Sequence, residues 1–368
     1  MRAAVMHESH QPLVVEEVDL DQPHAGEVLV RIAASGVCAS DLHVLDGTST
    51  IAKPPMVLGH EGAGVIEAVG EGVEGLQPGD HVVIALYGPC GGCGDCRAGD
   101  VTRCWSETRT QGMYGRMPDG STRLSLRGKP ITPMVGSGSL AEYAVVREAQ
   151  LVKIDREIPL HLACLAGCGV TTGVGAVLNV AQVAAGSTVA VVGCGGVGLN
   201  VIQGARIAGA ARILACDTQR GKLDLASDLG ATDCLEVEVG ADLSAAIKRI
   251  EPKGVDYAFE VIGSPEVVSA AFEATRIGGT TIMVGSPPGG SQIKIDGRAL
   301  FSDRRLLGCT GGQNVPARDI PRIMEFYRQG SLNLEKLVSQ RLPLARVNEA
   351  FEALKVGKLA RSVIDLIE

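Results

Sequence analysis

Short runs of β-branched residues, separated by turn residues, dominate the first 150 positions of the chain. Strands are expected at 28–32, 64–69 and 81–84, where Val and Ile recur between Gly, Pro and Asp. The sequence Pro78-Gly79-Asp80 favours a tight turn before the last of these strands, because proline presets φ and glycine accepts a left-handed angle. Residues 105–139 are polar, weakly periodic and interrupted by Gly and Pro, so they are expected to form a long insertion loop.

From about residue 160 the pattern changes to continuous apolar runs that alternate with helical stretches. Strands that are apolar throughout are typical of a parallel sheet covered on both faces, so a doubly wound α/β domain is predicted. The expected strands are 188–192, 212–216, 255–260 and 280–284, and the expected helices run from the glycine turn at 193–198 to about Ala208 and over 221–229. Mixed structure returns at the end, with a helix near 347–356 and a last strand at 362–367.

One stretch without charged residues, 158–205, has to be tested as a membrane segment. A bilayer span needs about 20 consecutive, mostly apolar residues. Glycines and side-chain amides, among them Gly167, Gly175, Asn179 and Gln182, interrupt every such window here. The stretch is therefore expected to form buried core, and no membrane partner is expected.

Composition narrows the class of protein further. A length of 368 residues predicts about two domains. Acidic residues outnumber basic ones by 42 to 34 and aromatic residues make up 3%, which argues against nucleic-acid binding because that usually needs a basic face and stacking rings. Eleven cysteines, an odd number, and the lack of an apolar signal segment at the N-terminus favour reduced thiols and a cytoplasmic protein.

A glycine-rich turn lies where the first strand of the α/β region meets its helix. Gly193, Gly195, Gly196 and Gly198 form a G-x-G-x-x-G pattern. Such glycines let the backbone approach a pyrophosphate at the positive end of a helix. Asp217 ends the next expected strand, where a carboxylate can accept both ribose hydroxyls and repel a 2′-phosphate. NAD is therefore expected in preference to NADP; the alternative is a glycine-rich turn that binds no ligand.

Four closely spaced cysteines are the strongest metal signal: Cys90, Cys93, Cys96 and Cys104. Gaps of two residues let the sulfurs converge on one ion, and a tetrahedral set of four thiolates is what structural zinc prefers. The glycines between them favour a tight lobe at 88–105. The spacing by itself leaves an iron–sulfur cluster or unrelated cysteines as alternatives.

A second set of possible ligands is dispersed along the chain: Cys38, the adjacent His60 and Glu61, and Cys168. A single cysteine is more often a small buried hydrophobe than a metal ligand. A single histidine is likewise more often a hydrogen-bonded residue of the interior. Spacing alone does not establish a site here.

Several segments, in one order along almost the whole chain, resemble those of zinc-containing alcohol dehydrogenases of the medium-chain dehydrogenase/reductase superfamily. The stretch Gly59-His60-Glu61-x2-Gly64-x5-Gly70-x2-Val73 is similar to the signature of that family. The other matching segments are 36–41, the four-cysteine lobe, 167–169, 193–198 and Lys358 to Arg361.

The resemblance implies a subunit of two domains. Residues 1–169 and 309–368 are expected to form a GroES-like, β-rich catalytic domain, and residues 170–308 a Rossmann domain that binds NAD. A homodimer is expected, with the segment 284–295 as a candidate for pairing across a sheet edge.

The resemblance also implies two Zn²⁺ per subunit, one structural in the four-cysteine lobe and one catalytic. Catalytic zinc is implied on Cys38, His60 and Cys168, which leave a fourth position for water or a substrate oxygen. Glu61 is able to approach as an alternate ligand. Asp41 matches the residue that orients the ligand histidine.

Further residues are assigned roles by the same resemblance. Ser40 and His43 match a proton relay, which needs a positioned hydroxyl and imidazole. Leu86 and Val170 match positions that line the substrate pocket. The implied cofactor contacts are Gly193, Gly195, Gly196, Val197, Gly198, Thr172, Asp217, Lys222 and Arg361.

The implied activity is the reversible oxidation of a primary alcohol to an aldehyde, with hydride transfer to NAD. Leu86 and Val170 replace ring-sized side chains of the liver-type enzymes, so aryl or long-chain alcohols are expected to be better substrates than ethanol. The segment 112–138 resembles the longer chains of the liver-type enzymes and of the glutathione-dependent formaldehyde dehydrogenases, but His43 stands where the formaldehyde dehydrogenases typically carry tyrosine. A thiol-dependent formaldehyde dehydrogenase and a zinc-free reductase of the same superfamily are the alternatives.

Overall fold

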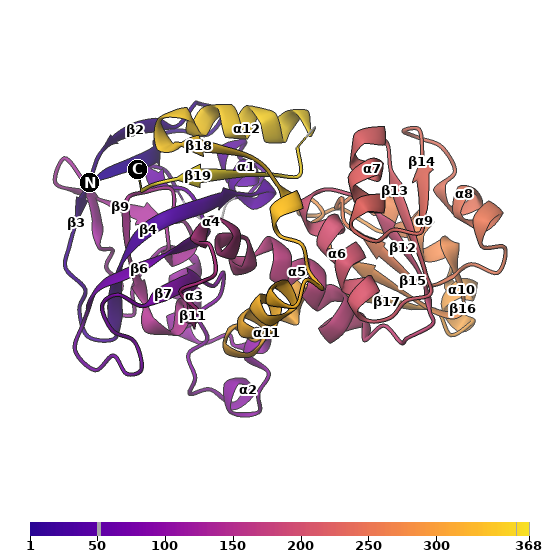
Figure 1. Ribbon diagram of the computed structural model, residues 1–368, viewed down its shortest axis with the longest axis horizontal. Coiled ribbons are helices and arrows are strands. Elements are labelled where there is room, and N and C mark those ends of the chain that lie inside the picture. The colour runs from indigo at the N-terminus through magenta and orange to yellow at the C-terminus, as the bar shows by residue number, and fades with distance from the viewer. Residues whose placement is uncertain (50–52, 358, 368) are drawn as a thin grey trace.

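A β-rich half and an α/β half make up the computed structural model, which describes residues 1–49, 53–357 and 359–367 and has both chain ends in the β-rich half (Figure 1). Lys358, part of the resemblance above, lies outside the described residues. The larger sheet of the β-rich half has the order β11-β7-β6-β4-β19-β18, with β10 paired to β4. Its strands are β4 (Glu27–Val37), β6 (Glu61–Val69), β7 (His81–Ile84), β10 (Tyr143–Arg147), β11 (Leu151–Ile154), β18 (Val338–Pro343) and β19 (Arg361–Asp365).

The C-terminal strand β19 returns to the N-terminal half of the chain. It runs antiparallel to β4, with Ser362 opposite Val37 and Asp365 opposite Ala34. A domain built from both chain ends accounts for this pairing. The domain boundaries given above, after residues 169 and 308, stay predictions.

A second sheet of the β-rich half has the order β2-β1-β5-β9-β8-β3. Its strands are β1 (Arg2–Met6), β2 (Val14–Glu17), β3 (Asp19–Leu20), β5 (Met56–Val57), β8 (Leu124–Leu126) and β9 (Lys129–Pro133). Strands β8 and β9 and helix α3 (Glu107–Met113) fall within 105–139, so the prediction of one long insertion loop was wrong. These elements are short, and their apolar residues Leu124 and Ile131 pack against Ala3, a partner far away in the sequence that local periodicity does not reveal.

The α/β half contains a parallel sheet of order β14-β13-β12-β15-β16-β17. Its strands are β12 (Thr188–Val192), β13 (Arg212–Asp217), β14 (Asp233–Glu236), β15 (Val255–Glu260), β16 (Thr275–Met283) and β17 (Arg305–Gly308). Its helices are α6 (Gly196–Ile207), α7 (Arg220–Asp228), α8 (Leu243–Ile250), α9 (Pro265–Ala274) and α10 (Gly297–Phe301). Strands β12 and β15 have the predicted bounds, whereas β16 begins earlier than the predicted residue 280.

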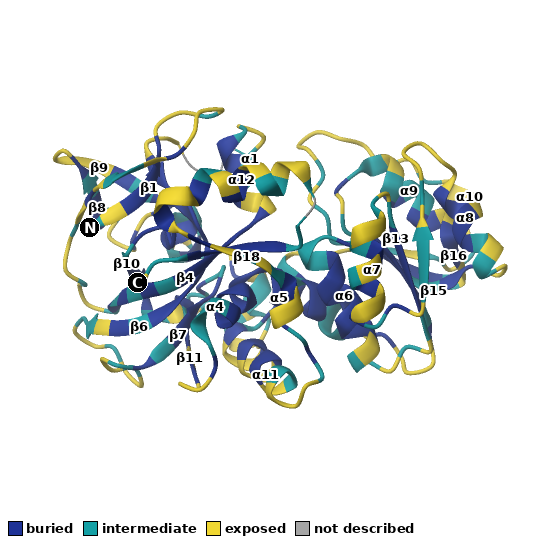
Figure 2. Cartoon of the chain, turned by 45° about the horizontal axis from the view of Figure 1, so that its top comes forward, coloured by how far each residue is buried: buried dark blue, intermediate teal, exposed yellow. Residues whose placement is uncertain are grey.

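One hydrophobic core extends from the β-rich half into the α/β half, and helix α5 contributes to it. The remaining helices are α1 (Ala39–Leu45), α2 (Gly94–Arg97), α4 (Leu160–Ala163), α5 (Gly169–Gly175), α11 (Pro316–Arg328) and α12 (Val347–Val356). The core runs from Val83 of the β-rich half through Val174 of α5 to Val191 of the α/β half, and α5 and α6 are largely buried (Figure 2). The uncharged stretch 158–205 thus supplies core, as predicted.

The helices of the described part of the chain can be compared with the length and apolar character that a bilayer span requires. No single helix there is long and apolar enough to cross a bilayer. One pair of helical segments, Leu160–Gly167 and Gly169–Ala181, passes the length and composition test only when taken together, and the two are bent by 57°.

Candidate active site

The first turn of α1 brings a buried carboxylate against a histidine. Asp41 Oδ1 accepts hydrogen bonds from Gly59 N (3.0 Å) and His60 Nδ1 (2.9 Å). Asp41 Oδ2 accepts one from Cys38 N (3.0 Å), so the carboxylate is fixed by three donors. With Nδ1 donating to Asp41, His60 Nε2 keeps a lone pair, and this buried atom has no hydrogen-bond partner among the described residues. A metal ion at Nε2 would satisfy it, with the carboxylate behind the ring as a common second partner of ligand histidines.

Four possible ligands gather at this point. One ligand atom each from Cys38, His60, Glu61 and Cys168 lies within 4.8 Å of the others, and all four residues are buried. A hydrogen bond from the Cys168 thiol, against the effect of burial, holds the pKa of Cys38 well below its usual value, and Arg361 lowers it further. Two sulfurs and an imidazole nitrogen are the donor set of a catalytic zinc that keeps one position open. The residues present therefore fit zinc.

Glu61 is paired with a buried arginine. Arg361 Nη1 lies 3.2 Å from Glu61 Oε1 and 3.3 Å from Oε2, and Gly169 N donates to Oε1 at 3.1 Å. Burial raises the pKa of Glu61 to about 8, although the charge of Arg361 acts in the opposite direction. A Cβ atom at Gly169 would lie 1.6 Å from Arg361 Nη2, so any other residue there would displace the guanidinium from its present place.

Arg361 also reaches the glycine-rich turn. A Cβ atom added to Gly196 would lie 2.3 Å from Arg361 Nε, while the side chain is 5% exposed. The guanidinium thus lies between the ligand cluster and the turn expected to hold pyrophosphate. Its contact with pyrophosphate stays a prediction, and its ion pair with Glu61 is a contact that the sequence did not indicate.

A cleft of about 560 Å³ opens beside the ligand cluster, a size typical of small-molecule sites. Ser40 and His43, both on α1, line it, and Ser40 Oγ lies 4.0 Å from Cys38 Sγ. Residues of both halves complete the wall: Asp46, Thr48, Ser49, Met113, Tyr114, Ser286, Pro287, Pro288 and Gly289. The structure therefore brings the two expected relay residues together next to the ligands.

Leu86 and Val170, the two residues expected to line the substrate pocket, both lie near Cys168 in the structure. Leu86 N donates to Gly167 O at 3.0 Å, and Val170 lies two residues after Cys168, in α5. Val170 is only 1% exposed and belongs to the core that joins the two halves. Contact of Leu86 and Val170 with substrate stays a prediction.

The expected dinucleotide site has the required backbone. A Cβ atom at Gly198 would lie 1.8 Å from Gly193 O, so the turn between β12 and α6 is as tight as the pattern predicted. Asp217 Oδ2 accepts from Cys194 N (2.8 Å) and Oδ1 from Gln219 N (3.0 Å), which fixes the carboxylate at the end of β13. Lys222 Nζ lies 3.9 Å from Asp217 Oδ2.

A second cavity of about 590 Å³ adjoins this turn. Gly193, Gly195, Asp217 and Lys222 are among its lining residues, so four of the expected cofactor contacts face one space. Thr172 and Val197 lie at the junction of α5 and α6, where Thr172 N donates to Cys168 O at 2.8 Å. Their cofactor contacts stay predictions.

One residue of this region escaped the sequence analysis. The buried Glu260 ends β15, and its Oε1 accepts from the backbone N–H groups of Ile262 (2.9 Å), Gly263 (2.8 Å) and Ser264 (3.4 Å). Burial raises the pKa of Glu260, against these hydrogen bonds. Ile262 and Ser264 line the cavity, so Glu260 shapes its rim. Its position at the end of a predicted strand was the signal that could have indicated it.

The four-cysteine lobe projects from the β-rich half around α2 (Figure 1). The sulfurs of Cys90, Cys93, Cys96 and Cys104 lie within 4.8 Å of one another. Backbone N–H groups point at them, with Cys93 N 3.3 Å from Cys90 Sγ and Cys90 N 3.4 Å from Cys104 Sγ. The side chain of Ser106 and the backbone of Cys93 and Gly92 lower the pKa of Cys90 to about 6. A closed set of four sulfurs with N–H support fits a structural zinc.

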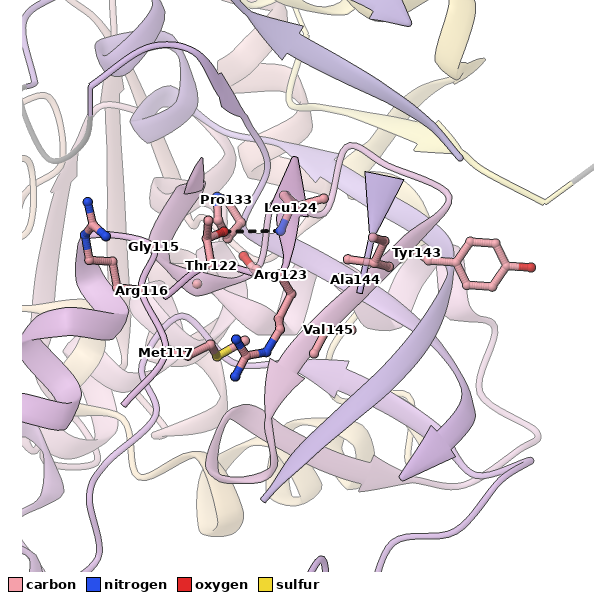
Figure 3. Close-up of a pocket in the computed structure, with 13 residues that line it drawn as sticks. Gly115, Arg116, Met117, Thr122, Arg123, Leu124, Pro133, Tyr143, Ala144 and Val145 are labelled. Carbon is pink, nitrogen blue, oxygen red and sulfur yellow. Dashed lines mark hydrogen bonds between the residues drawn. The ribbon is translucent and has the colours of Figure 1, made fainter. Parts of the chain in front are cut away.

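Another cavity, lined by Gly115, Met117, Thr122, Arg123 and Pro133 among others, is too small for a substrate. Its volume of about 10 Å³ is roughly that of a single water probe. Figure 3 shows the ring of Tyr143 directed away from it. This cavity is therefore no candidate active site.

Comparison with known proteins agrees with the geometry. The family model of the alcohol dehydrogenase GroES-like domain matches residues 24–156, and that of the zinc-binding dehydrogenases matches residues 196–329. An S-(hydroxymethyl)glutathione dehydrogenase of Haemophilus influenzae is 42% identical over 365 residues, which are 99% of this chain and 96% of that protein. The chain belongs to the zinc-dependent alcohol dehydrogenases of the medium-chain dehydrogenase/reductase superfamily.

Solved structures extend the match to the whole fold of the chain. An alcohol dehydrogenase zinc-binding domain protein from Burkholderia ambifaria has a TM-score of 0.94 at 37% identity, covering 100% of this chain and 99% of that chain. Benzyl alcohol dehydrogenase from Acinetobacter calcoaceticus has a TM-score of 0.93 at 34% identity, with the same coverage.

Membership of this family confirms the predicted fold class and cofactors, but not the predicted substrate. The fold class, a GroES-like domain with a Rossmann sheet, is confirmed. Zinc and NAD as cofactors of this dehydrogenase are confirmed as well, and the two ligand clusters agree with two zinc ions. The relatives differ in the substrate that their names carry, so the family leaves the substrate to be argued from the cleft.

Proposed function

We propose that this alcohol dehydrogenase reversibly oxidises an uncharged primary alcohol to the aldehyde with NAD, and prefers aryl or long-chain alcohols to ethanol. The charge of the cleft carries the proposal. Among the described residues that line it there is one carboxylate, Asp46, and no Lys or Arg. Burial raises the pKa of Asp46, but hydrogen bonds from Thr48 outweigh this and lower it, so the carboxylate stays ionised.

This charge bears on the choice between an alcohol and a glutathione adduct. S-(Hydroxymethyl)glutathione carries two carboxylates and one ammonium group, so its net charge is negative, and recognition of its carboxylates normally uses Arg or Lys. A cleft that presents Asp46 to such a ligand repels it, and like charges brought together are a common means of rejecting a wrong partner. A neutral alcohol meets no such barrier.

The chain's own residues divide the work of this reaction. Zinc on Cys38, His60 and Cys168 would supply Lewis acidity toward the alcohol oxygen, and NAD would accept the hydride. Asp41 holds the His60 ring in the orientation that presents Nε2.

Ser40 and His43 transfer the proton, and Asp217 selects the cofactor. Ser40 accepts the proton of the substrate hydroxyl as it gives up its own proton in the direction of His43, one helical turn further along α1, and His43 releases a proton to solvent. Asp217 binds the adenosine ribose and excludes a 2′-phosphate, which supports NAD over NADP.

Initial rates of NADH formation test the proposal. Benzyl alcohol, 1-octanol and ethanol are compared with S-(hydroxymethyl)glutathione formed from formaldehyde and glutathione. We expect kcat/KM to be higher for benzyl alcohol or octanol than for the other two. A preference for ethanol contradicts the aryl or long-chain assignment.

The second candidate function is oxidation of S-(hydroxymethyl)glutathione. The 42% identity to the Haemophilus influenzae enzyme of that name, and 40% to an Escherichia coli enzyme of the same name, favours it. Activity that requires glutathione would establish it and refute the argument from Asp46. The variant Asp46→Asn sharpens the test, because removal of the charge should raise the rate with the glutathione adduct relative to that with benzyl alcohol.

We also propose a homodimer in a reducing, cytoplasmic environment. The segment 284–295, predicted from the sequence to pair across a sheet edge, forms no strand. Strand β17 is one of the two edges of the parallel sheet and exposes Leu307. An open strand edge is a natural pairing surface. All eleven cysteines are free, and the ligand clusters need reduced thiols. Light scattering of the purified protein tests the dimer; a monomer mass refutes it.

A further inference from the structure

Helix α3 connects the four-cysteine lobe to the substrate cleft. At its start, Ser106 Oγ accepts from Arg109 N at 3.2 Å and lies 3.4 Å from the sulfur of Cys104. At its end, Met113 and the following Tyr114 line the cleft. A helix of seven residues thus begins beside a ligand of the structural metal and ends beside the substrate.

Arg109 fastens this helix to the lobe. Its side chain is 4% exposed, and Nη1 donates to Thr102 O at 2.8 Å and to Cys104 O at 2.5 Å. The guanidinium lies 4.8 Å from the ring centroid of Tyr87 and 5.7 Å from that of Trp105. Carbonyl contacts and stacking on rings together use the planar shape of arginine, which lysine does not share.

The last turn of α3 is held from the other side. A Cβ atom at Gly112 would lie 3.0 Å from Nη2 of the buried Arg147, and the same Nη2 donates to Gly88 O at 2.9 Å. Gly88 lies between β7 and Cys90, the first cysteine of the lobe. The start of α3 therefore contacts the lobe directly, and its end lies against Arg147 of β10, whose guanidinium bonds to the lobe at Gly88.

We propose that the four-cysteine lobe sets substrate selectivity, because it holds α3 so that Met113 and Tyr114 form an apolar wall of the substrate cleft. Arg109 is the positioning residue of this arrangement, and Met113 and Tyr114 determine specificity. The inference deepens the proposed function and rests on it.

The chemistry of the wall favours an aromatic substrate. Tyr114 is 54% exposed and lines the cleft, and both an aromatic ring and a thioether such as that of Met113 make favourable contacts with aromatic rings. Pro287 and Pro288 from the α/β half line the same cleft. A benzyl group held between these side chains gains contacts that ethanol does not make.

The wall is tested with Tyr114→Ala and Met113→Ala. We expect the ratio of kcat/KM for benzyl alcohol to that for ethanol to fall by about threefold to tenfold in each, mainly through KM for benzyl alcohol. Tyr327→Ala is the matched control, because Tyr327 lies on α11 and its hydroxyl bonds to Glu335 outside the cleft. A wild-type ratio in both cleft variants overturns the assignment of the wall.

The positioning role is tested with Arg109→Met and, as the milder change, Arg109→Lys. We expect both to lower the same ratio, with the larger effect in Arg109→Met, while NADH binding measured by fluorescence titration stays at the wild-type value. Zinc per subunit is measured in the same preparations, as a readout that does not depend on turnover. A wild-type ratio in the folded Arg109 variants, with or without loss of zinc, overturns the proposal.

These outcomes are separate from a failure of the proposed function. If the wild-type enzyme oxidises neither alcohol, the proposed function is wrong and the ratio does not exist. If it oxidises both and the variants keep the wild-type ratio, the proposed function stands and the link from the lobe to selectivity is wrong.

Discussion

Asp41 offers the sharpest test of the catalytic metal site, through the variant Asp41→Asn. The carboxylate accepts from three donors, Cys38 N, Gly59 N and His60 Nδ1, and all of it is buried. Asparagine keeps the shape but replaces one acceptor oxygen by an NH₂ group. Whichever way the amide is placed, a donor then faces a donor: against Cys38 N in one orientation, and against Gly59 N and the His60 ring in the other.

The size of the effect follows from these contacts. A buried donor left without an acceptor costs about 1–3 kcal/mol. Loss of the group behind a ligand histidine weakens metal binding by about 10-fold to 100-fold. At about 1.4 kcal/mol for each factor of ten, this corresponds to about 1.4–2.8 kcal/mol, so the two estimates agree.

Metal analysis after titration with a chelator measures this effect. We expect Asp41→Asn to fall from two zinc ions per subunit to one at a chelator concentration about 10-fold to 100-fold below that needed for the wild type. The remaining ion belongs to the four-cysteine lobe, which the substitution does not touch. Asp228→Asn is the control, because that aspartate is exposed and pairs only with Lys336 among the described residues. Equal chelator resistance in Asp41→Asn and wild type would refute the role of Asp41.

Four further predictions concern the cofactor site, the lobe and stability. Asp217→Gly should raise kcat/KM with NADP relative to NAD, because a carboxylate that repels a 2′-phosphate is lost; an unchanged ratio of the two initial rates contradicts this. Glu260→Ala should weaken NADH binding in a fluorescence titration by about tenfold, since three N–H groups lose their acceptor, whereas Glu260→Gln keeps an acceptor oxygen and should bind almost normally. If Glu260→Ala and Glu260→Gln weaken NADH binding equally, the hydrogen bonds that Glu260 accepts are not the cause. Cys93→Ser should leave one zinc ion per subunit, and retention of two excludes a four-thiolate site. Asp119→Asn should lower the apparent Tm at neutral pH by a few degrees at most, because this half-exposed carboxylate contributes less than about 1 kcal/mol. Hydrogen bonds from Ser121 hold the pKa of Asp119 below its usual value, so its stabilisation is complete above the ordinary aspartate range and is lost as the pH falls through and below it. A difference in Tm that persists in acid contradicts this assignment.

The sequence predicted best those features that are local. Strands β12 and β15 and helix α12 have the predicted bounds, because each is a single run whose apolar positions keep one period. The four cysteines of the lobe were predicted together, since short gaps in the chain force the sulfurs into one place. The dispersed ligands Cys38, His60 and Cys168 needed the family resemblance, because nothing in their spacing brings them together.

The sequence did not predict elements that depend on contacts between residues far apart in the chain. Helix α3 and the strands β8 and β9 are too short for a periodic signal, and they are stabilised by packing against residues far away in the chain. Met113 and Tyr114 were missed for the same reason, since their place in the cleft depends on where α3 ends. The four residues Ser286 to Gly289 complete the cleft from the other half. They lie in the segment 284–295, which the sequence pointed to only as a candidate for pairing in a dimer, so their place in the cleft was missed.

The ion pair of Glu61 and Arg361 shows most clearly why the chain has to close on itself to make its active site. The two residues are 300 positions apart, and neither is accessible enough for water to stabilise its charge. Burial disfavours the ionised form of Glu61 and raises its pKa to about 8, and the charge of Arg361 offsets part of this cost beside two sulfurs. The guanidinium also takes the space that side chains at Gly169 and Gly196 would need. The glycine after Cys168 and a glycine of the dinucleotide turn are therefore fixed by one arginine at the start of the last strand.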